Sequence, residues 1–308
     1  MVHKGRIKQA LYTLGIGFLE DKEKNEIKGK TSLVQFRIAE ENEEYLRIEV
    51  EFMHQCVNNK VILSALLHFN RQVIPFGQFY ISPRNTICLG LLLPLLQLEW
   101  LDIVLYYLLS VGEAYFPQLA TDLFILPFDE RSLGIDPYVP LRTKLLAPRN
   151  FSNPNAYTTS VILARMLAAM VGEKNVISIS ETQMSVCYEQ QWINISLQPL
   201  PYARRKLGQG DWSIVLQTEV GVIKYLDSRL LVYLNRKNYE STTLAFTYRY
   251  LDSKPLILLQ SELVPYLIQY SAYLEWLLNA HKVASNELLE YLTFPYQIQS
   301  VIQYKLNL

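Results

Sequence analysis

The same order of predicted elements occurs twice in this chain, and the repeat restricts its fold more than any other feature. Each half begins with a helix, continues with antiparallel strands, a short helix and a strand hairpin, and ends with a long helix. The closest local match is Leu66–Arg71 against Leu231–Arg236, in which Asn70 and Asn235 stand 165 positions apart. One duplicated domain plus a connector would produce such a spacing. The sequence therefore predicts two tandem α+β domains.

A proline-rich stretch separates the two halves. Five of the fourteen prolines lie between Pro127 and Pro154. Because proline fixes φ and keeps the preceding residue out of the helical region, this density predicts a stiff connector. A chain of 308 residues also fits two domains of ordinary size. We therefore predict a first domain over 1–127, a linker over 128–154 and a second domain over 155–308, arranged as a pseudo-dimer.

Hydrophobic periodicity predicts the elements of each half. In the first half these are a helix over 6–14, strands over 33–38 and 45–52, a helix over 58–69, a hairpin over 77–81 and 87–93, and a helix over 98–116. In the second half they are a helix ending at Gly172, strands over 178–188, 192–198 and 212–220, a helix over 226–234, strands over 242–250 and 255–260, and a helix over 262–280. The second half thus has one more strand near its start. The alternating stretch Tyr296–Tyr304 either adds a strand or forms a tail.

Patterns typical of catalytic or metal sites are weak in this sequence. The four histidines are scattered, and no pair of them has metal-ligand spacing. The sequence contains neither a Gly-x-Ser-x-Gly elbow nor a phosphate-binding loop that ends in Gly-Lys-Ser/Thr. Gly15-Ile-Gly17 begins like a dinucleotide fingerprint, but it ends in Glu20 and follows a predicted helix rather than a strand. We expect no catalytic residues, no cofactor and no bound metal.

Charge and hydropathy bear on partners and compartment. Lys+Arg and Asp+Glu number 29 each and no long basic run occurs, which gives no reason to expect nucleic acid or an anionic membrane as a partner. The apolar run over 86–110 is interrupted by Pro94, Glu99 and Asp102, so we expect no membrane span. With no secretory signal at the start, the cytoplasm is the expected compartment. Buried thiols are expected at three separated positions: Cys56, Cys88 and Cys187.

Three segments of the first half carry a likeness to a known family. They are Leu66–Arg71, Gly77-Gln-Phe-Tyr80 and Leu92-Leu-Pro94-Leu95. The second half keeps Leu234-Asn-Arg236, but its hairpin lacks the glycine. On these motifs, residues 4–119 and 157–289 resemble the YbjN-like, type III secretion chaperone-like family in a tandem form, and the first copy is the more typical one.

The resemblance implies a compact domain with a curved antiparallel sheet backed by helices. It also implies a bacterial cytoplasmic protein of a class whose members pair as dimers and bind extended segments of client proteins. A tandem chain would then be a dimer within one polypeptide, monomeric in solution. We expect a non-catalytic protein-binding module, a chaperone or adaptor, with a protein partner. The alternatives are an enzyme with a site between the domains and a structural subunit of a larger complex.

The recurring Asn-Arg pair supplies the candidate partner-binding residues, namely Asn70, Arg71, Asn235 and Arg236. The alternative role is structural, because asparagine tolerates the left-handed conformation at a helix end and arginine can bond the last carbonyls. The 21 tyrosines also suit recognition, since tyrosine offers a large rigid contact area with a polar tip. Four of them are predicted to lie opposite the aliphatic faces: Tyr45, Tyr106, Tyr248 and Tyr250. A tyrosine-rich sheet face or an interdomain groove is the expected binding surface.

Overall fold

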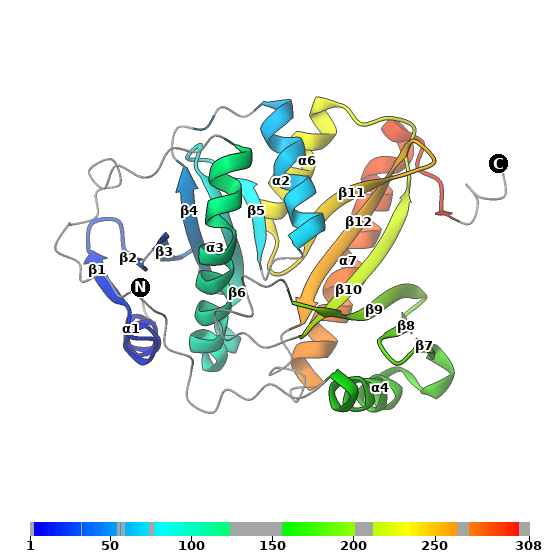
Figure 1. Cartoon of the computed structure of the whole chain (residues 1–308), viewed down its shortest axis with the longest axis horizontal. Coiled ribbons are helices and arrows are strands. Elements are labelled where there is room, and N and C mark those ends of the chain that lie inside the picture. Colours follow the sequence, from blue (N-terminus) through cyan, green and yellow to red (C-terminus); the bar gives the residue numbers. More distant parts are fainter. Residues whose placement is uncertain are drawn as a thin grey trace.

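The chain folds into two six-stranded antiparallel sheets, each packed with helices (Figure 1). This computed structural model describes residues 3–31, 33–53, 56, 59–73, 77–123, 156–200, 212–263 and 271–301. The predicted fold class, two tandem α+β domains arranged as a pseudo-dimer, is confirmed. The predicted linker over 128–154 lies outside the described residues, so the domain boundaries stay predictions.

The first domain contains one hairpin that the sequence did not predict. Its elements are α1 (Lys4–Thr13), β1 (Gly17–Asp21), β2 (Glu26–Lys30), β3 (Gln35–Glu40), β4 (Tyr45–Met53), α2 (Lys60–Val73), β5 (Gln78–Ile81), β6 (Ile87–Pro94), the 3-10 helix η1 (Leu95–Trp100) and α3 (Leu101–Asp122). The unpredicted hairpin is β1–β2, which turns at Asn25 with φ at 54°. Its sequence is rich in charge, so the apolar alternation that indicates a strand is missing there.

The second domain repeats the plan of the first. Its elements are α4 (Ala156–Val171), the 3-10 helix η3 (Glu173–Asn175), β7 (Val176–Ser180), β8 (Gln183–Tyr188), β9 (Gln191–Pro199), β10 (Trp212–Val222), α6 (Ser228–Glu240), β11 (Ala245–Leu251), β12 (Lys254–Leu263) and α7 (Ser271–Tyr296). As predicted, Gly172 ends the first of these helices, with φ at 86°. Asp227 caps α6 by accepting a hydrogen bond from the backbone of Leu230 at 2.8 Å.

Strand order is the same in both sheets. The first sheet runs β1-β2-β3-β4-β6-β5 and the second runs β7-β8-β9-β10-β12-β11. The prediction that the second half has one more strand than the first is therefore wrong, because each sheet has six. The segment predicted as a single strand over 178–188 forms the second part of β7 and the whole of β8, which pair as a hairpin. The hairpin β1–β2 occupies the same place in the first sheet.

The predicted closing helix over 262–280 is wrong at its start. The strand β12 continues to Leu263 and is buried on both faces over nearly all of its length, whereas α7 begins at Ser271. Burial on both faces removes the alternation that separates a strand from a buried helix. The stretch Tyr296–Tyr304, for which the sequence left a strand or a tail open, forms in its described part a single bridge between Val222 and Gln299.

Each sheet has an inner face covered by helices of its own domain. In β4 the aliphatic side chains of Ile48 and Val50 point inward, and Gly112 of α3 lies directly on Val50. In the second domain α4 packs against β7 and β8, while α7 packs against β10 and β12. We call the opposite side of each sheet its outer face.

The two domains meet through exchanged helices, which Figure 1 shows side by side between the sheets. Helix α2 lies against β11 of the second domain, and α6 lies against β5 of the first. Thr247 donates a hydrogen bond to the carbonyl of Leu67 at 2.5 Å, and the hydroxyls of Ser64 and Tyr248 are 2.7 Å apart. Within the described part of the chain, no helix is long and apolar enough to span a bilayer.

Candidate functional site

The two predicted asparagines lie in the protein interior. Asn70 is inside α2, where its amide accepts from the backbone N–H of Phe79 at 2.7 Å and donates to the carbonyl of the same residue at 2.9 Å. Asn235 forms the same pair of bonds with Ile81, at 2.8 and 3.0 Å, across the joint between the domains. Both amides thus bind the backbone of β5. This role is structural, but it differs from the capping of a helix end that the sequence suggested.

The adjacent arginines are more accessible. Arg71 lies 3.2 Å from Nδ1 of His68, and the exposed Arg236 pairs with Glu240 one turn further along α6 at 2.6 Å. Contact of any of these four residues with a partner stays a prediction.

The structural counterpart of Asn70 is Asn238, three residues beyond the one that the sequence repeat indicated. Asn238 accepts from the N–H of Phe246 at 2.7 Å and donates to its carbonyl at 3.0 Å, as Asn70 does with Phe79. The separation is 238 − 70 = 168 positions. Sheet pairing agrees, because Glu49 and Gln217 hold the same register positions and 217 − 49 = 168. A strand phenylalanine eight or nine residues after each asparagine was the signal that could have corrected the alignment.

One row of paired residues crosses the outer face of each sheet, and the two rows can be compared position by position. In the first sheet the row is Leu19, Lys28, Arg37, Glu49, Gly90 and Gln78. In the second sheet it is Ile177, Ser185, Asn194, Gln217, Gln260 and Ala245. Three consecutive ionic side chains of the first row are therefore replaced by neutral polar ones in the second.

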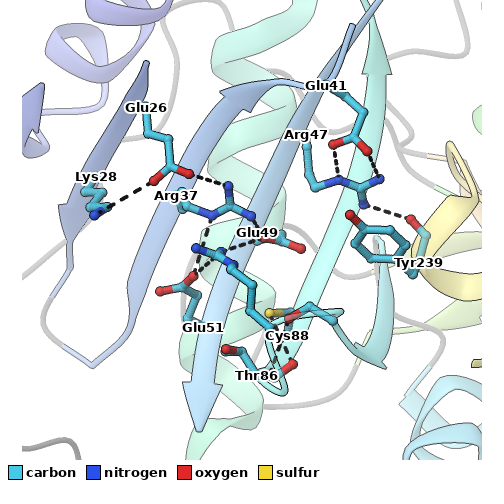
Figure 2. Close-up of polar contacts among 12 residues, drawn as sticks. Glu26, Lys28, Arg37, Glu41, Arg47, Glu49, Glu51, Thr86, Cys88 and Tyr239 are labelled. Carbon is cyan, nitrogen blue, oxygen red and sulfur yellow. Dashed lines mark hydrogen bonds and ion pairs between the residues drawn. The ribbon is translucent and has the colours of Figure 1, made fainter. Parts of the chain in front are cut away.

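The outer face of the first sheet is closed by ion pairs centred on Arg37 (Figure 2). The Arg37 guanidinium bonds Glu49 and lies 2.8 Å from Glu26 and 3.7 Å from Glu51. Arg84 reaches over the same carboxylates, 2.9 Å from Glu51 and 3.3 Å from Glu49. Both arginines bond one oxygen of the fully buried Glu49, and the Tyr80 hydroxyl donates to the other at 2.9 Å. Each oxygen thus has a partner, which is the condition for burying a carboxylate.

Burial and charge oppose each other in the titration of this network. Burial alone would lower the pKa of Arg37, but the charges of Glu49 and Glu26 reverse that effect and raise it. Burial raises the pKa of Glu51, and Glu49 adds to this while Arg84 and Arg37 oppose it. Burial and the nearby Glu49 also raise the pKa of the Cys88 thiol. A thiol held protonated is a poor nucleophile, so the network is suited to structure rather than to covalent chemistry.

Arg47 extends the polar face to the joint between the domains. Its guanidinium donates to Glu41 at 2.7 Å and to the backbone carbonyl of Tyr239 at 2.8 Å. It also lies 3.7 Å above the Tyr239 ring, which contacts Tyr80 edge to face. The alternation of β4 indicated a half-buried strand, but it gave no sign that the polar side would also be covered.

The outer face of the second sheet is exposed mainly along β9, where Trp192 and Asn194 are accessible. Ser185 and Gln260 of the same row are buried. Ser185 donates to Asn194 at 2.7 Å, and Gln260 donates to Gln217 at 3.2 Å. Trp192 lies next to them with 46% of its side chain exposed, at the position that Gln35 holds in the first sheet. The sequence predicted a strand over 192–198, but only the sheet register shows which polar residues surround it. The row from Ser185 to Gln260 is uncharged, whereas Glu262 and the ion pair of Arg249 with Glu219 lie on the same face in neighbouring rows.

The tyrosines and the joint fit the expected binding surface poorly. Tyr106 lies in the core of α3, which contradicts its predicted place opposite the aliphatic face, whereas Tyr250 is exposed. Where Leu93, Tyr273 and Trp276 meet, the described part of the joint has a crevice of about 10 Å³, room for one water molecule. A partner segment does not fit into that crevice.

The remaining candidates for chemistry are mostly core residues. His281 is buried in α7 with its ring nitrogens 2.9 Å from the hydroxyls of Thr218 and Ser261, and burial lowers its pKa to about 3. Cys56 and Cys88 are buried as predicted, while Cys187 is half-buried. Among the residues that the structure describes, no group of three His, Cys, Asp or Glu side chains could hold a metal ion. No protein-family model matches the chain, and no curated protein matches it.

Proposed function

We propose that the protein is a non-catalytic, cytoplasmic protein-binding module, a chaperone or adaptor that holds a protein partner. The partner lies on the outer face of the second sheet, around Trp192. The observation that carries this proposal is the large aromatic side chain of Trp192, which is 46% exposed near the start of β9, beside a row of neutral hydrogen-bonding side chains. Aromatic residues are enriched at the centres of protein interfaces, where they often supply much of the binding energy.

The contrast between the two outer faces supports this placement. Covering Arg37 and Glu49 with a partner would further desolvate charges that already satisfy one another. Covering Ser185, Asn194 and Gln217 costs less, because a partner can replace the water around neutral groups with hydrogen bonds of its own. The second face is therefore the better binding surface.

The joint between the domains also supports a binding role. Helix α2 of the first domain packs against β11 of the second, and α6 of the second packs against β5 of the first, so the two domains resemble a dimer within one polypeptide. Linkage in one chain allows the two sheets to diverge, and here the ionic row of the first sheet is matched by a row of neutral side chains in the second. This agrees with the family resemblance, which implies that the partner segment is extended.

The test uses a model protein that is reduced and alkylated so that it stays unfolded, with binding to the full chain measured by interferometry. We expect Trp192→Ala to weaken binding by on the order of 2 kcal/mol, about thirtyfold in Kd. Ser196→Arg, on the same face, should have a similar effect while leaving the tryptophan in place. Tyr12→Ala is the matched control, because Tyr12 is an exposed aromatic residue on α1 of the first domain.

The same variants then serve as baits in native extract. Proteins retained by the wild type and by Tyr12→Ala, but lost with Trp192→Ala and Ser196→Arg, are partners held at this face. If the wild type binds neither the unfolded probe nor any protein in this pattern, the binding role is wrong. If binding survives both changes, the role stands and the face is wrong.

A further inference from the structure

The strand β7 forms an edge of the second sheet and carries no charge. It pairs with β8 on one side, and no other strand of the described chain pairs with it. Its sequence is Val-Ile-Ser-Ile-Ser, and Ile177 and Ile179 are 49% and 62% exposed. An uncharged edge strand with exposed apolar side chains is a ready template for another strand.

The corresponding edge of the first sheet, β1, is protected by charge. Glu20 and Asp21 lie on that strand, and Lys4 and Lys8 of α1 bind Glu20 at 2.5 and 2.7 Å. These two lysines lower the pKa of Glu20 to about 2, so the carboxylate stays ionised at physiological pH. Fixed charges on an edge oppose strand pairing. Two edges with the same place in the fold therefore differ in their protection.

Both isoleucines of β7 lie on one side of the sheet, because side chains two residues apart share a face and the bulge that follows does not change this. Ile177 pairs with Ser185 and so lies on the outer face. The register shifts between Ser178 and Ser180, because Ile179 and Ser180 together stand opposite the single residue Gln183. In such a bulge both side chains point to the same side as the residue opposite, so Ile179 joins Ile177 on the outer face.

We propose that a second copy of this chain pairs with β7, antiparallel and centred on Ser178. In that register Ile177 of one copy stands opposite Ile179 of the other, and Ser178 of one copy stands opposite Ser178 of the other. Apolar side chains thus meet apolar side chains on the outer face, in both halves of the twofold pair. The apolar pattern of the strand is complementary to itself.

The charges at the two ends of β7 are complementary to themselves as well. Lys174 precedes the strand and Glu181 follows it; both are exposed, and neither forms an ion pair with a described residue. Antiparallel pairing about Ser178 brings Lys174 of one copy to the same end as Glu181 of the other. The twofold axis repeats this attraction at the opposite end. Charge therefore favours a second copy in this register.

The resulting dimer is weak and extends the sheet. A strand of five residues buries less area than the roughly 1,200 Å² of a stable interface, so the dimer dissociates on dilution. Two second-domain sheets become continuous, and five strand spacings of about 4.8 Å place the two β9 strands, which carry Trp192, roughly 24 Å apart across the sheet. The dimer therefore presents two outer faces on one side, and its formation does not depend on the proposed binding role.

Sedimentation velocity of the full chain over a wide concentration range tests the proposal. We expect a monomer at low concentration and a dimer at high concentration. Ile179→Lys places a charge in the paired strand and should leave a monomer throughout. Phe294→Lys is the matched control, because Phe294 is 94% exposed near the end of α7 and should keep the wild-type behaviour. Thermal melting followed by circular dichroism shows that each variant is folded.

A charge exchange tests the register. Lys174→Glu places like charges at both ends of the pair and should weaken the dimer, roughly threefold to tenfold in Kd. Adding Glu181→Lys restores the attraction, so the double variant should regain wild-type affinity. Ser178→Cys should form a disulfide-linked dimer on oxidation, at a yield above that of the wild type, and should lose it when combined with Ile179→Lys.

The possible results distinguish a second copy of the chain from a different polypeptide as the partner of β7. A wild-type chain that stays monomeric at every concentration overturns the proposal and leaves the edge to a different polypeptide. A dimer that survives Ile179→Lys also overturns it, because the contact then lies elsewhere. Trp192→Ala should leave dimerisation unchanged, so failure here is distinguishable from failure of the proposed function.

Discussion

At the scale of single residues, His281 shows how a buried polar group depends on its partners. The imidazole lies between α7 and the second sheet, and hydroxyls of Thr218 and Ser261 contact its two nitrogens. Burial lowers its pKa from 6.5 to about 3, so the ring is neutral in the folded protein near neutral pH. The unfolded chain binds a proton below pH 6.5 and the folded one does not, so acid favours unfolding.

The first prediction concerns this titration. Above pH 6.5 the histidine costs nothing, and between pH 6.5 and 3 it lowers the free energy of unfolding. The loss should be about 1.4 kcal/mol per pH unit. We expect His281→Gln to be less stable at neutral pH by about 1–3 kcal/mol, because it cannot reproduce both contacts. Its stability should nevertheless fall less steeply with acid, as urea titrations at several pH values would show.

The control for this prediction is His68→Gln, since His68 is exposed on α2. Its pKa is lowered by partial burial and by Arg71, so that variant should change the slope in the same direction but less than His281→Gln does. Equal slopes for His281→Gln and the wild type would mean that the histidine is protonated in the fold.

At the scale of elements, buried asparagines join helices to the neighbouring edge strands. Asn70 attaches α2 to β5 and Asn238 attaches α6 to β11, each through both polar atoms of the amide. A short edge strand has backbone groups without ladder partners, and the amide occupies one N–H and one carbonyl of that edge. Equal bonding in both domains makes this a conserved feature of the duplicated plan within the chain.

The second prediction follows from this equivalence. Asn70→Ala and Asn238→Ala should each lower the free energy of unfolding by about 2–4 kcal/mol, because each leaves two buried backbone groups unpaired. Arg71→Ala changes a neighbouring, more exposed side chain and should stay within about 0.5 kcal/mol. Chemical unfolding followed by tryptophan fluorescence measures all three. If Asn238→Ala were as mild as Arg71→Ala, the equivalence with Asn70 would be wrong.

At the scale of the whole molecule, the exchanged helices make each domain depend on the other. The surface of α2 that meets β11 would be exposed in a separate first domain, and that of α6 in a separate second domain. Arg47 would lose its contacts with Tyr239, which lies on the other side of the joint. Covalent linkage keeps these surfaces at a high effective concentration for each other.

The third prediction is that the halves 1–127 and 155–308 are unstable alone but recover together. Each half expressed separately should aggregate or unfold at a lower temperature than the full chain. Co-expressed halves should co-purify as a one-to-one complex with a melting temperature closer to that of the intact protein. Two separate halves that are stable and monomeric, and that do not associate, would show that the joint contributes little.

Sequence patterns succeeded where the fold depends on local periodicity. Alternation in β4 correctly separated inward Ile48 and Val50 from outward Arg47 and Glu49. Sequence patterns did not predict the charged β1–β2 hairpin, and they placed the end of the continuously buried β12 in a helix. In the first case Ile27 alone is a fully buried apolar residue of β2, and its neighbours form ion pairs such as Lys28–Asp21 at 3.2 Å. A hydrophobic pattern cannot report such a strand.

The sequence by itself determined that the chain contains one α+β plan twice, because apolar periodicity sets which face of each element is buried. Tertiary structure alone decided which polar residues matter. It moved the counterpart of Asn70 from Asn235 to Asn238, covered Glu49 with arginines from two other segments, and left Trp192 exposed. The reason is physical: the burial of a polar side chain depends on partners brought together by strand register and by the exchanged helices, and neither is visible in local sequence.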